Sequence, residues 1–203
     1  MKQKVSGKEK IVEAALKLIA KRGGVDITMA QIAKAARMSR QAVYLHFSDR
    51  GELMIALARH TDQKRGLDAE IQHIRDAPTG LEAIRRMVSL QARSNPSIWP
   101  IARMFEALRR SDPEVERPWQ DRLQHRLAGC QQIMRRVEKE GNLRPGMPVE
   151  VAADLMWTLT SLRMWEDLVL LRGWGPKKYE QYVCGVLLHA VTKHAEATPE
   201  SAS

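Results

Sequence analysis

Long apolar runs and paired cysteines are both missing from this sequence of 203 residues. The most apolar stretch, residues 151–171, is interrupted by charged side chains, which excludes a membrane span. Residues 1–10 are charged rather than apolar, so no secretory signal is expected. The two cysteines, Cys130 and Cys184, lie far apart and without metal-ligand spacing. A disulfide scaffold is therefore excluded, and a cytoplasmic protein with buried thiols is expected.

Signals for β-strands and for catalysis are equally scarce. Hardly any segment alternates apolar and polar residues, and no Asn-Gly or Asp-Gly turn separates two β-branched runs. The sequence contains no nucleophile elbow, no glycine-rich phosphate loop and no metal-ligand pattern. The adjacent Glu166 and Asp167 point in different directions on a helix, which is typical of surface charges. We therefore expect an all-α protein that is not an enzyme and that has no cofactor and no metal.

Positive charge is concentrated in the first third of the chain. Residues 1–65 hold 14 Lys and Arg against 6 Asp and Glu, whereas residues 66–203 hold 19 against 18. All five tryptophans lie beyond residue 98. A basic surface of this kind suits a polyanion, either a nucleic acid or an anionic membrane. The pattern predicts a small basic module followed by a larger, nearly neutral one.

Four helix-start signals occur within the basic module. Residues 6–9, 28–31 and 49–52 fit capping boxes, and Ser39 fits an N-cap. Residues 28–47 then form a helix, a tight turn and a second helix, which predicts a helix-turn-helix whose second helix fits a major groove. Its inward residues would be Val43 and Phe47. Side chains able to contact bases or phosphates are Thr28, Arg40, Gln41, Tyr44 and His46.

This segment resembles the N-terminal domain of TetR-type bacterial transcriptional regulators. The resemblance rests on Thr28-x-x-x-Ile32-Ala33-x-x-Ala36 followed by Ser39-Arg40-x-x-Val43-Tyr44-x-His46-Phe47-x-x-Arg50-x-x-Leu53. It implies that Thr28 caps the positioning helix and meets a phosphate, and that Arg50 clamps another. It also implies that Arg40, Gln41 and Ala42 face bases, while Tyr44 and His46 contact backbone or base. One departure is Arg37, which stands where glycine often supplies a left-handed turn, at a strain of about 1 kcal/mol.

The resemblance further implies how the chain is organised. Residues 1–65 would form a three-helix helix-turn-helix domain that binds operator DNA, and residues 66–203 a larger helical domain for effector binding and dimerisation. The chain would then be a homodimeric repressor of a palindromic operator, released by a small apolar or aromatic effector. Two alternatives stay open: a DNA-binding regulator that is constitutive or controlled by a protein partner, and, less well supported by these short capped helices, a membrane-surface protein.

The larger module is expected to contain long helices at about 67–76, 80–94, 98–110, 113–140, 148–172 and 176–195. Its methionines and tryptophans have two interpretations, either core and dimer interface or an adaptable apolar effector pocket. The last two helices are apolar enough to pair with their copies in a four-helix bundle. Candidate pocket residues are Trp99, Arg103, Met104, Phe105, Met134, Trp157, Met164 and Trp165.

Overall fold

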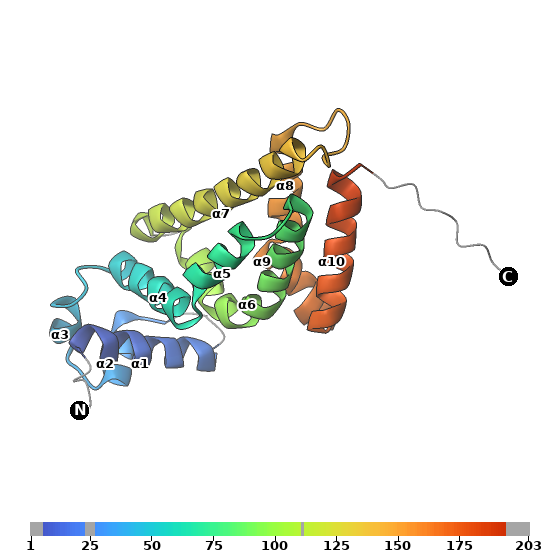
Figure 1. The fold of residues 1–203 in the computed structure, drawn as a ribbon. Helices are drawn as coiled ribbons and strands as arrows, with labels where there is room; N and C mark the ends of the chain where they lie inside the picture. The colour runs from blue at the N-terminus through green and yellow to red at the C-terminus, as the bar shows by residue number, and fades with distance from the viewer. Residues whose placement is uncertain (1–5, 23–26, 111, 194–203) are drawn as a thin grey trace, which may run out of the picture. The chain divides into compact units, whose positions relative to one another are not determined.

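The computed structural model describes residues 6–22, 27–110 and 112–193, and within these ranges every regular element is a helix. An isolated bridge between Leu143 and Thr192 accompanies them. The expected all-α fold is therefore confirmed. The helices, labelled as in Figure 1, are α1 (Gly7–Arg22), α2 (Met29–Ala36), α3 (Arg40–Tyr44), α4 (Arg50–Lys64), α5 (Leu67–Arg75), α6 (Gly80–Leu108), α7 (Pro113–Lys139), α8 (Val149–Leu159), α9 (Leu162–Trp165), the π-helix η1 (Glu166–Leu171) and α10 (Pro176–Val191).

The chain divides into two compact units. The first unit comprises residues 1–68 and 96–123, and the second comprises residues 69–95 and 124–203. The long helices α6 and α7 each contribute one part to each unit. The functional division expected at residue 65 stays a prediction, and the first unit extends beyond it by taking in residues 96–123.

The core of the first unit is built by α1, which packs against α2 and α4. Each of these helices buries one apolar stripe, and burying a Leu, Ile or Phe side chain contributes about 1.5–3 kcal/mol. The inward positions expected for Val43 and Phe47 are confirmed, since the two side chains are 0% and 1% exposed. The other fully buried residues of this core include Ile11, Ala15, Ile19, Ile27, Ile32, Leu53, Met54 and Leu57.

The helix starts follow the expected caps, with one difference. The hydroxyls of Ser6, Thr28 and Ser39 and the carboxylate of Asp49 each accept the backbone N–H three residues later. The boxes at Ser6 and Thr28 are reciprocal, as expected. At α4 the returning bond differs, because Glu52 accepts the N–H of Ser48 rather than that of the N-cap. The bond to Glu52 therefore ties Ser48, the residue before the N-cap Asp49, to the first turn of α4.

Three helices predicted in the larger module have different bounds. The helices expected at 80–94 and 98–110 are one helix, α6, which continues through Pro96 and Pro100. The two prolines each remove one ladder N–H, and the buried face of α6 on both sides of them outweighs this loss. The helix expected at 148–172 ends at Leu159, because the Thr160 hydroxyl bonds back to the Met156 carbonyl and Ser161 caps α9.

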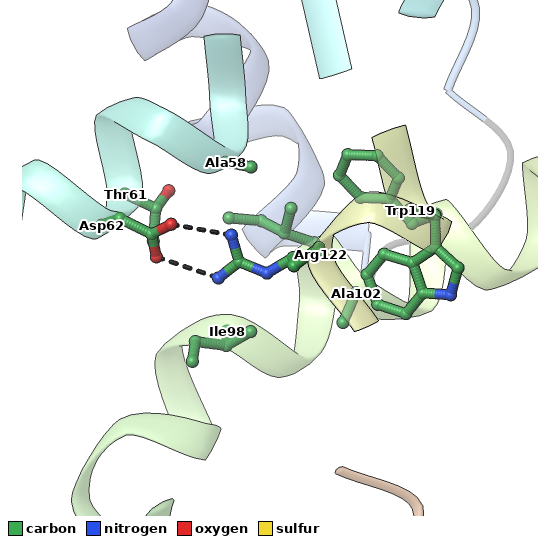
Figure 2. A pocket seen from close by; sticks show the side chains of 9 residues that line it. Ala58, Thr61, Asp62, Ile98, Ala102, Trp119 and Arg122 are labelled. Carbon is green, nitrogen blue, oxygen red and sulfur yellow. Dashed lines mark hydrogen bonds and ion pairs between the residues drawn. The ribbon is translucent and has the colours of Figure 1, made fainter. Parts of the chain in front are cut away.

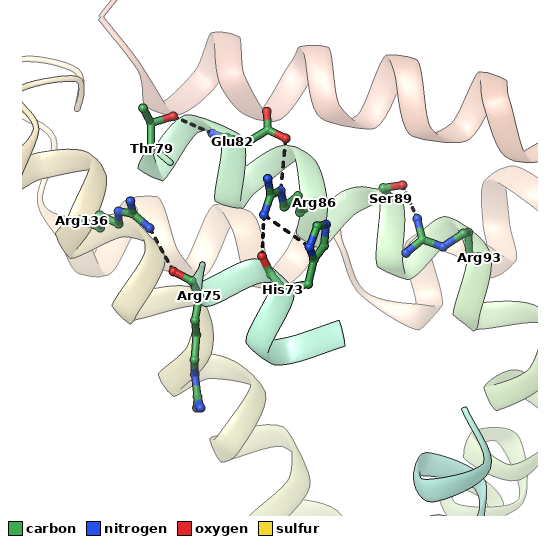
Figure 3. A network of polar contacts seen from close by, with 8 residues as sticks. All are labelled: His73, Arg75, Thr79, Glu82, Arg86, Ser89, Arg93 and Arg136. Carbon is green, nitrogen blue, oxygen red and sulfur yellow. Dashed lines mark hydrogen bonds and ion pairs between the residues drawn. The ribbon is translucent and has the colours of Figure 1, made fainter. Parts of the chain in front are cut away.

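In the second unit, α8 packs against α10, which turns Val183, Leu187 and Val191 inward. Gly141 follows the end of α7 with a φ of 69°, and the N–H of Asn142 bonds back to the Val137 carbonyl. Arginines hold the end of α5, since Arg86 donates to the His73 carbonyl at 2.7 Å and Arg136 to the Arg75 carbonyl at 3.3 Å (Figure 3). These bonds satisfy carbonyls that a helix end leaves without partners.

Candidate functional site

The turn between α2 and α3 is closed by a residue other than glycine. Arg37 has φ 56° and ψ 43°, and it is the one non-glycine residue with a positive φ in the described ranges. Its N–H bonds to the Lys34 carbonyl, and the N–H of Met38 bonds to the Ala33 carbonyl at 2.9 Å. These two bonds form a Schellman motif that ends α2. The left-handed turn expected from the sequence is therefore present although a side chain occupies it.

The second helix of the motif, α3, presents its polar residues outward. Arg40 and Gln41 are exposed in its first turn, Tyr44 is 43% exposed, and Ala42 is half-buried. The helix has five residues and ends before residue 47, the end expected from the sequence, because regular bonding stops at Tyr44 and a turn follows. Leu45, in that turn, is 86% exposed. Thr28, at the start of α2, is also exposed. Base and phosphate contacts by these side chains stay predictions.

His46 lies against the first residue of α1. A Cβ placed on Gly7 would lie 2.4 Å from His46 Nε2 and 2.7 Å from Cε1. Because glycine has a hydrogen in place of a side chain, the imidazole can occupy this space. His46 is half-buried. The ring therefore links the turn after α3 to the N-terminus of α1, whatever contact it makes with DNA.

Arg50 is also engaged within the first unit. Its Nη2 donates to the Ile27 carbonyl, directly before the Thr28 cap of α2. Arg50 thus joins α4 to the start of the helix-turn-helix, and a phosphate contact would use its remaining donors. Close by, Lys8 pairs with Glu52 at 3.2 Å and lies 5.3 Å from the centre of the Phe47 ring. The hydrogen bond from the Ser48 backbone N–H is the main cause that lowers the pKa of the Glu52 carboxyl, and the bond from Lys8 lowers it further.

Four of the expected effector residues lie in the first unit. Met104 and Phe105 are buried, and Phe105 stacks on Trp119 with ring centres 5.2 Å apart. Arg103 is exposed and lies over the Trp99 ring at 5.1 Å. The neighbouring cavity in Figure 2 has about 10 Å³, roughly the room for one water molecule. A bidentate ion pair between Arg122 and Asp62, at 2.7 and 3.0 Å, lines that cavity.

The other four lie in the second unit. Met134 is 0% and Trp165 4% exposed, so both belong to its core. Met164 and Trp157 are half-buried. The effector role of all eight residues stays a prediction, and within each unit the core interpretation accounts for the buried ones.

Two kinds of site are missing from the part of the chain that the structure describes. No group of three or more His, Cys, Asp or Glu side chains is arranged to hold a metal ion there. Among the described helices, none combines the length and the apolar character that a membrane span requires.

Comparison with known protein families gives a match that contains the helix-turn-helix segment. Residues 11–57 fit the model of the bacterial regulatory proteins of the TetR family. The HTH-type transcriptional repressor Rv1474c of Mycobacterium tuberculosis is 27% identical over 164 residues, which are 80% of this chain and 78% of that one. This match extends well beyond the helix-turn-helix into the second unit.

Solved structures share the fold over nearly the whole chain. A transcriptional regulator from Saccharomonospora viridis in complex with choline has a TM-score of 0.72 and 19% identity, covering 92% of this chain and 98% of that one. NalD, the secondary repressor of the MexAB-OprM multidrug efflux pump in Pseudomonas aeruginosa, has a TM-score of 0.71 and 20% identity, covering 93% and 97%.

Residues 11–57 are thus similar to the TetR family of bacterial regulatory proteins, and the named relative is an HTH-type transcriptional repressor. The resemblance drawn from residues 28–53 is thereby confirmed. The named relatives are transcriptional regulators and repressors, which supports a DNA-binding regulator rather than an enzyme.

Sequence reasoning missed two polar residues in the second unit of the chain. Arg126 lies on the same face of α7 as the buried Cys130, Met134 and Val137, and Tyr179 is 0% exposed in α10. The spacing of four, four and three residues from Arg126 to Val137 was the available signal, because it places an arginine in an apolar stripe. Tyr179 gave no comparable signal, since a tyrosine is common in helix cores.

Proposed function

We propose that this chain is a homodimeric repressor that binds a palindromic operator in the cytoplasm and is released by a small-molecule effector. The exposed side of α3 is the observation that supports the DNA-binding part of this proposal. Arg40 and Gln41 are both exposed in its first turn, and both side chains can bond bidentately to base edges, Arg to guanine and Gln to adenine.

The positive charge of the N-terminal residues also supports DNA binding by this surface. The net charge of residues 1–65 is +8, from 14 basic and 6 acidic side chains. Neutralising DNA phosphates with such side chains releases counterions, so binding should weaken steeply as salt is raised. Thr28, Tyr44 and Arg50 are the proposed phosphate contacts that orient α3 in the groove.

Dimer formation is supported by apolar side chains that the chain leaves in solvent. On α10, Tyr182 is 53% and Val186 54% exposed, on the side of the helix next to that of the buried Val183 and Leu187. On α8, Val151 is 47% exposed. Pairing α8 and α10 with their copies would cover these side chains in a four-helix arrangement and would place two α3 helices on two half-sites. The other residues expected at this interface are half-buried: Leu155, Leu159 and Leu162.

The proposal is tested by selecting DNA sequences with the purified protein and measuring half-site variants. Gln41→Ala should relax specificity at one base pair per half-site, with a loss of roughly 1–3 kcal/mol there and a smaller effect on random DNA. Arg50→Ala should weaken all sequences alike and lower the salt slope by about one unit. The matched control is Gln132→Ala, which removes an exposed glutamine from α7. Selection without any enriched sequence would refute the proposal, and identical patterns for the two variants would refute the separate roles.

A further inference from the structure

Arg126 directs a positive charge into the second unit. Its guanidinium lies over the Trp157 ring, 4.9 Å from the ring centre. Only one of its nitrogens, Nη2, donates to oxygens of the described residues, namely the Trp157 carbonyl and, at 3.4 Å, the Thr160 hydroxyl. Both acceptors are neutral and lie in the last turn of α8.

No carboxylate of the described residues pairs with Arg126. Three other half-buried arginines do have such partners: Arg109 has Glu106 and Glu116, Arg122 has Asp62, and Arg136 has Glu140. Burial lowers the pKa of the Arg126 guanidinium, the direction expected when a charge loses water without gaining an opposite charge. An arginine nevertheless keeps its proton, so Arg126 is a cation that has no counter-ion among the described residues.

Two more donors near this cation have no acceptor among the described residues. The Tyr179 hydroxyl is buried without a hydrogen-bond partner on a side chain that is 0% exposed, and the indole Nε1 of Trp157 is buried likewise. Burial raises the pKa of Tyr179 to about 12, against the opposing effect of the Arg126 charge. The phenol is therefore neutral, and its O–H is available to donate.

We propose that Arg126 and Tyr179 bind the carboxylate of an organic acid, which is the effector of this regulator. An ionised carboxylate is an acceptor only, and its two oxygens match the fork of a guanidinium. The apolar remainder of the ligand would lie among the side chains of the adjacent turns of α7 and α8, including Met134 and Met156. This inference rests on the proposed function, because it assigns a chemical class to the effector named there.

The sign of the buried charge separates this chain from one of its structural neighbours. The Saccharomonospora viridis regulator was solved in complex with choline, a quaternary ammonium cation. In this chain the face of Trp157 is already covered by a cation, and a second cation beside Arg126 would be repelled. The ligand class therefore differs although the fold is shared.

A purely structural role for Arg126 accounts for less of what is observed. Nη2 does stabilise the end of α8 by bonding to a carbonyl of its last turn. That bond needs one nitrogen, and it gives no reason for the Tyr179 hydroxyl to be buried without an acceptor. A bound carboxylate would satisfy the phenol and the remaining guanidinium donors together.

The test is a thermal-shift series on the full chain with straight-chain carboxylates from butanoate to decanoate and with phenylacetate, each beside its own amide. An acid and its amide share shape, so their difference reports the charge. We expect at least one acid to bind at least about tenfold more tightly than its amide, the range of a charged hydrogen bond. The corresponding alkyltrimethylammonium ions should give no shift.

Three variants identify the groups responsible. Arg126→Met keeps the apolar stem and should abolish the preference for acid over amide. Tyr179→Phe removes one oxygen from a ring that stays buried, and it should weaken acid binding several-fold; it also tests the site if Arg126→Met fails to fold. Arg135→Met, at an exposed position of the same helix, is the control and should leave the preference unchanged.

Two results would overturn the inference. One is a wild-type chain that prefers no acid to its amide, and the other is a preference that persists in both Arg126→Met and Tyr179→Phe. Binding of the selected DNA is measured on the same samples without acid. Failure to bind DNA would refute the proposed function, whereas DNA binding without any acid preference would refute only the carboxylate site.

Discussion

The imidazole of His46 and the Cα of Gly7 are so close that a Cβ at position 7 would lie 2.4 Å from Nε2. The turn that follows α3 therefore rests on the first residue of α1. Position 7 needs glycine here because of this close approach and not because of its backbone conformation.

Substituting Gly7 tests whether this contact positions the DNA-binding face. Gly7→Ala should displace the His46 ring, which links the turn after α3 to α1, and should thereby weaken specific DNA binding several-fold. His46→Ala opens space, so Gly7→Ala should have little further effect in that background. Affinity for the selected operator in this double-mutant cycle is the measurement. Equal losses in both backgrounds would contradict the link between the two residues.

Arg37 is the position where glycine should stabilise the protein. Arg37→Gly relieves a left-handed conformation and should raise the free energy of unfolding by about 1 kcal/mol. Arg37→Ala is the matched control, because it removes the same charge while keeping the strain, and no gain is expected from it. Urea denaturation of the three proteins distinguishes them. A similar gain in both variants would show that the charge, and not the backbone, sets the stability.

The exposed apolar side of α10 predicts a dimer interface. Val186→Glu places a carboxylate at its centre and should shift the protein toward a single 23.1 kDa species in sedimentation equilibrium. Gln181→Glu adds the same charge to an exposed polar position of α10 and should leave the dimer intact. A wild-type chain that sediments only as a monomer at micromolar concentration would rule out the dimer itself.

Two buried acids make the protein sensitive to alkali. Burial raises the pKa of Cys130 to about 11 and that of Tyr179 to about 12, from ordinary values of 9.0 and 10.0. The unfolded chain therefore loses these protons first, and the free energy of unfolding should fall as pH rises from about 9 to about 12. Tyr179→Phe should lose less stability by about 1 kcal/mol between pH 9 and 11. Urea denaturation at both pH values checks this, and equal losses in both proteins would contradict the assignment to Tyr179.

The sequence was most informative where side chains bond to their own backbone. The starts at Ser6, Thr28, Ser39 and Asp49 were predictable because a cap is a local arrangement of four residues. The stop at Gly141 was predictable for the same reason. The burial of Val43 and Phe47 followed from helical spacing, and the family resemblance followed from the residue motif between Thr28 and Leu53.

The larger module was less predictable because tertiary packing decides it. Pro96 and Pro100 favoured a break that packing overrides, and α6 runs through both. The opposite error occurred at Thr160 and Ser161, whose hydroxyls interrupt a pattern that looked continuous. The Arg126 cluster joins α7, α8 and α10, and no spacing within one helix indicates which residues of another helix lie beside it.

The first turn of α6 depends on a residue far along the chain. The N–H of Gly80 donates to the Glu140 carboxylate at 2.7 Å, 60 residues away in sequence, and a Cβ on Gly80 would lie 2.7 Å from the Val137 side chain. Contacts of such long sequence separation form late in folding, because the intervening chain must first be ordered. During synthesis the Gly80 N–H therefore gains this acceptor only after Glu140 has been added to the chain, whereas the Thr79 hydroxyl can cap the Glu82 N–H earlier.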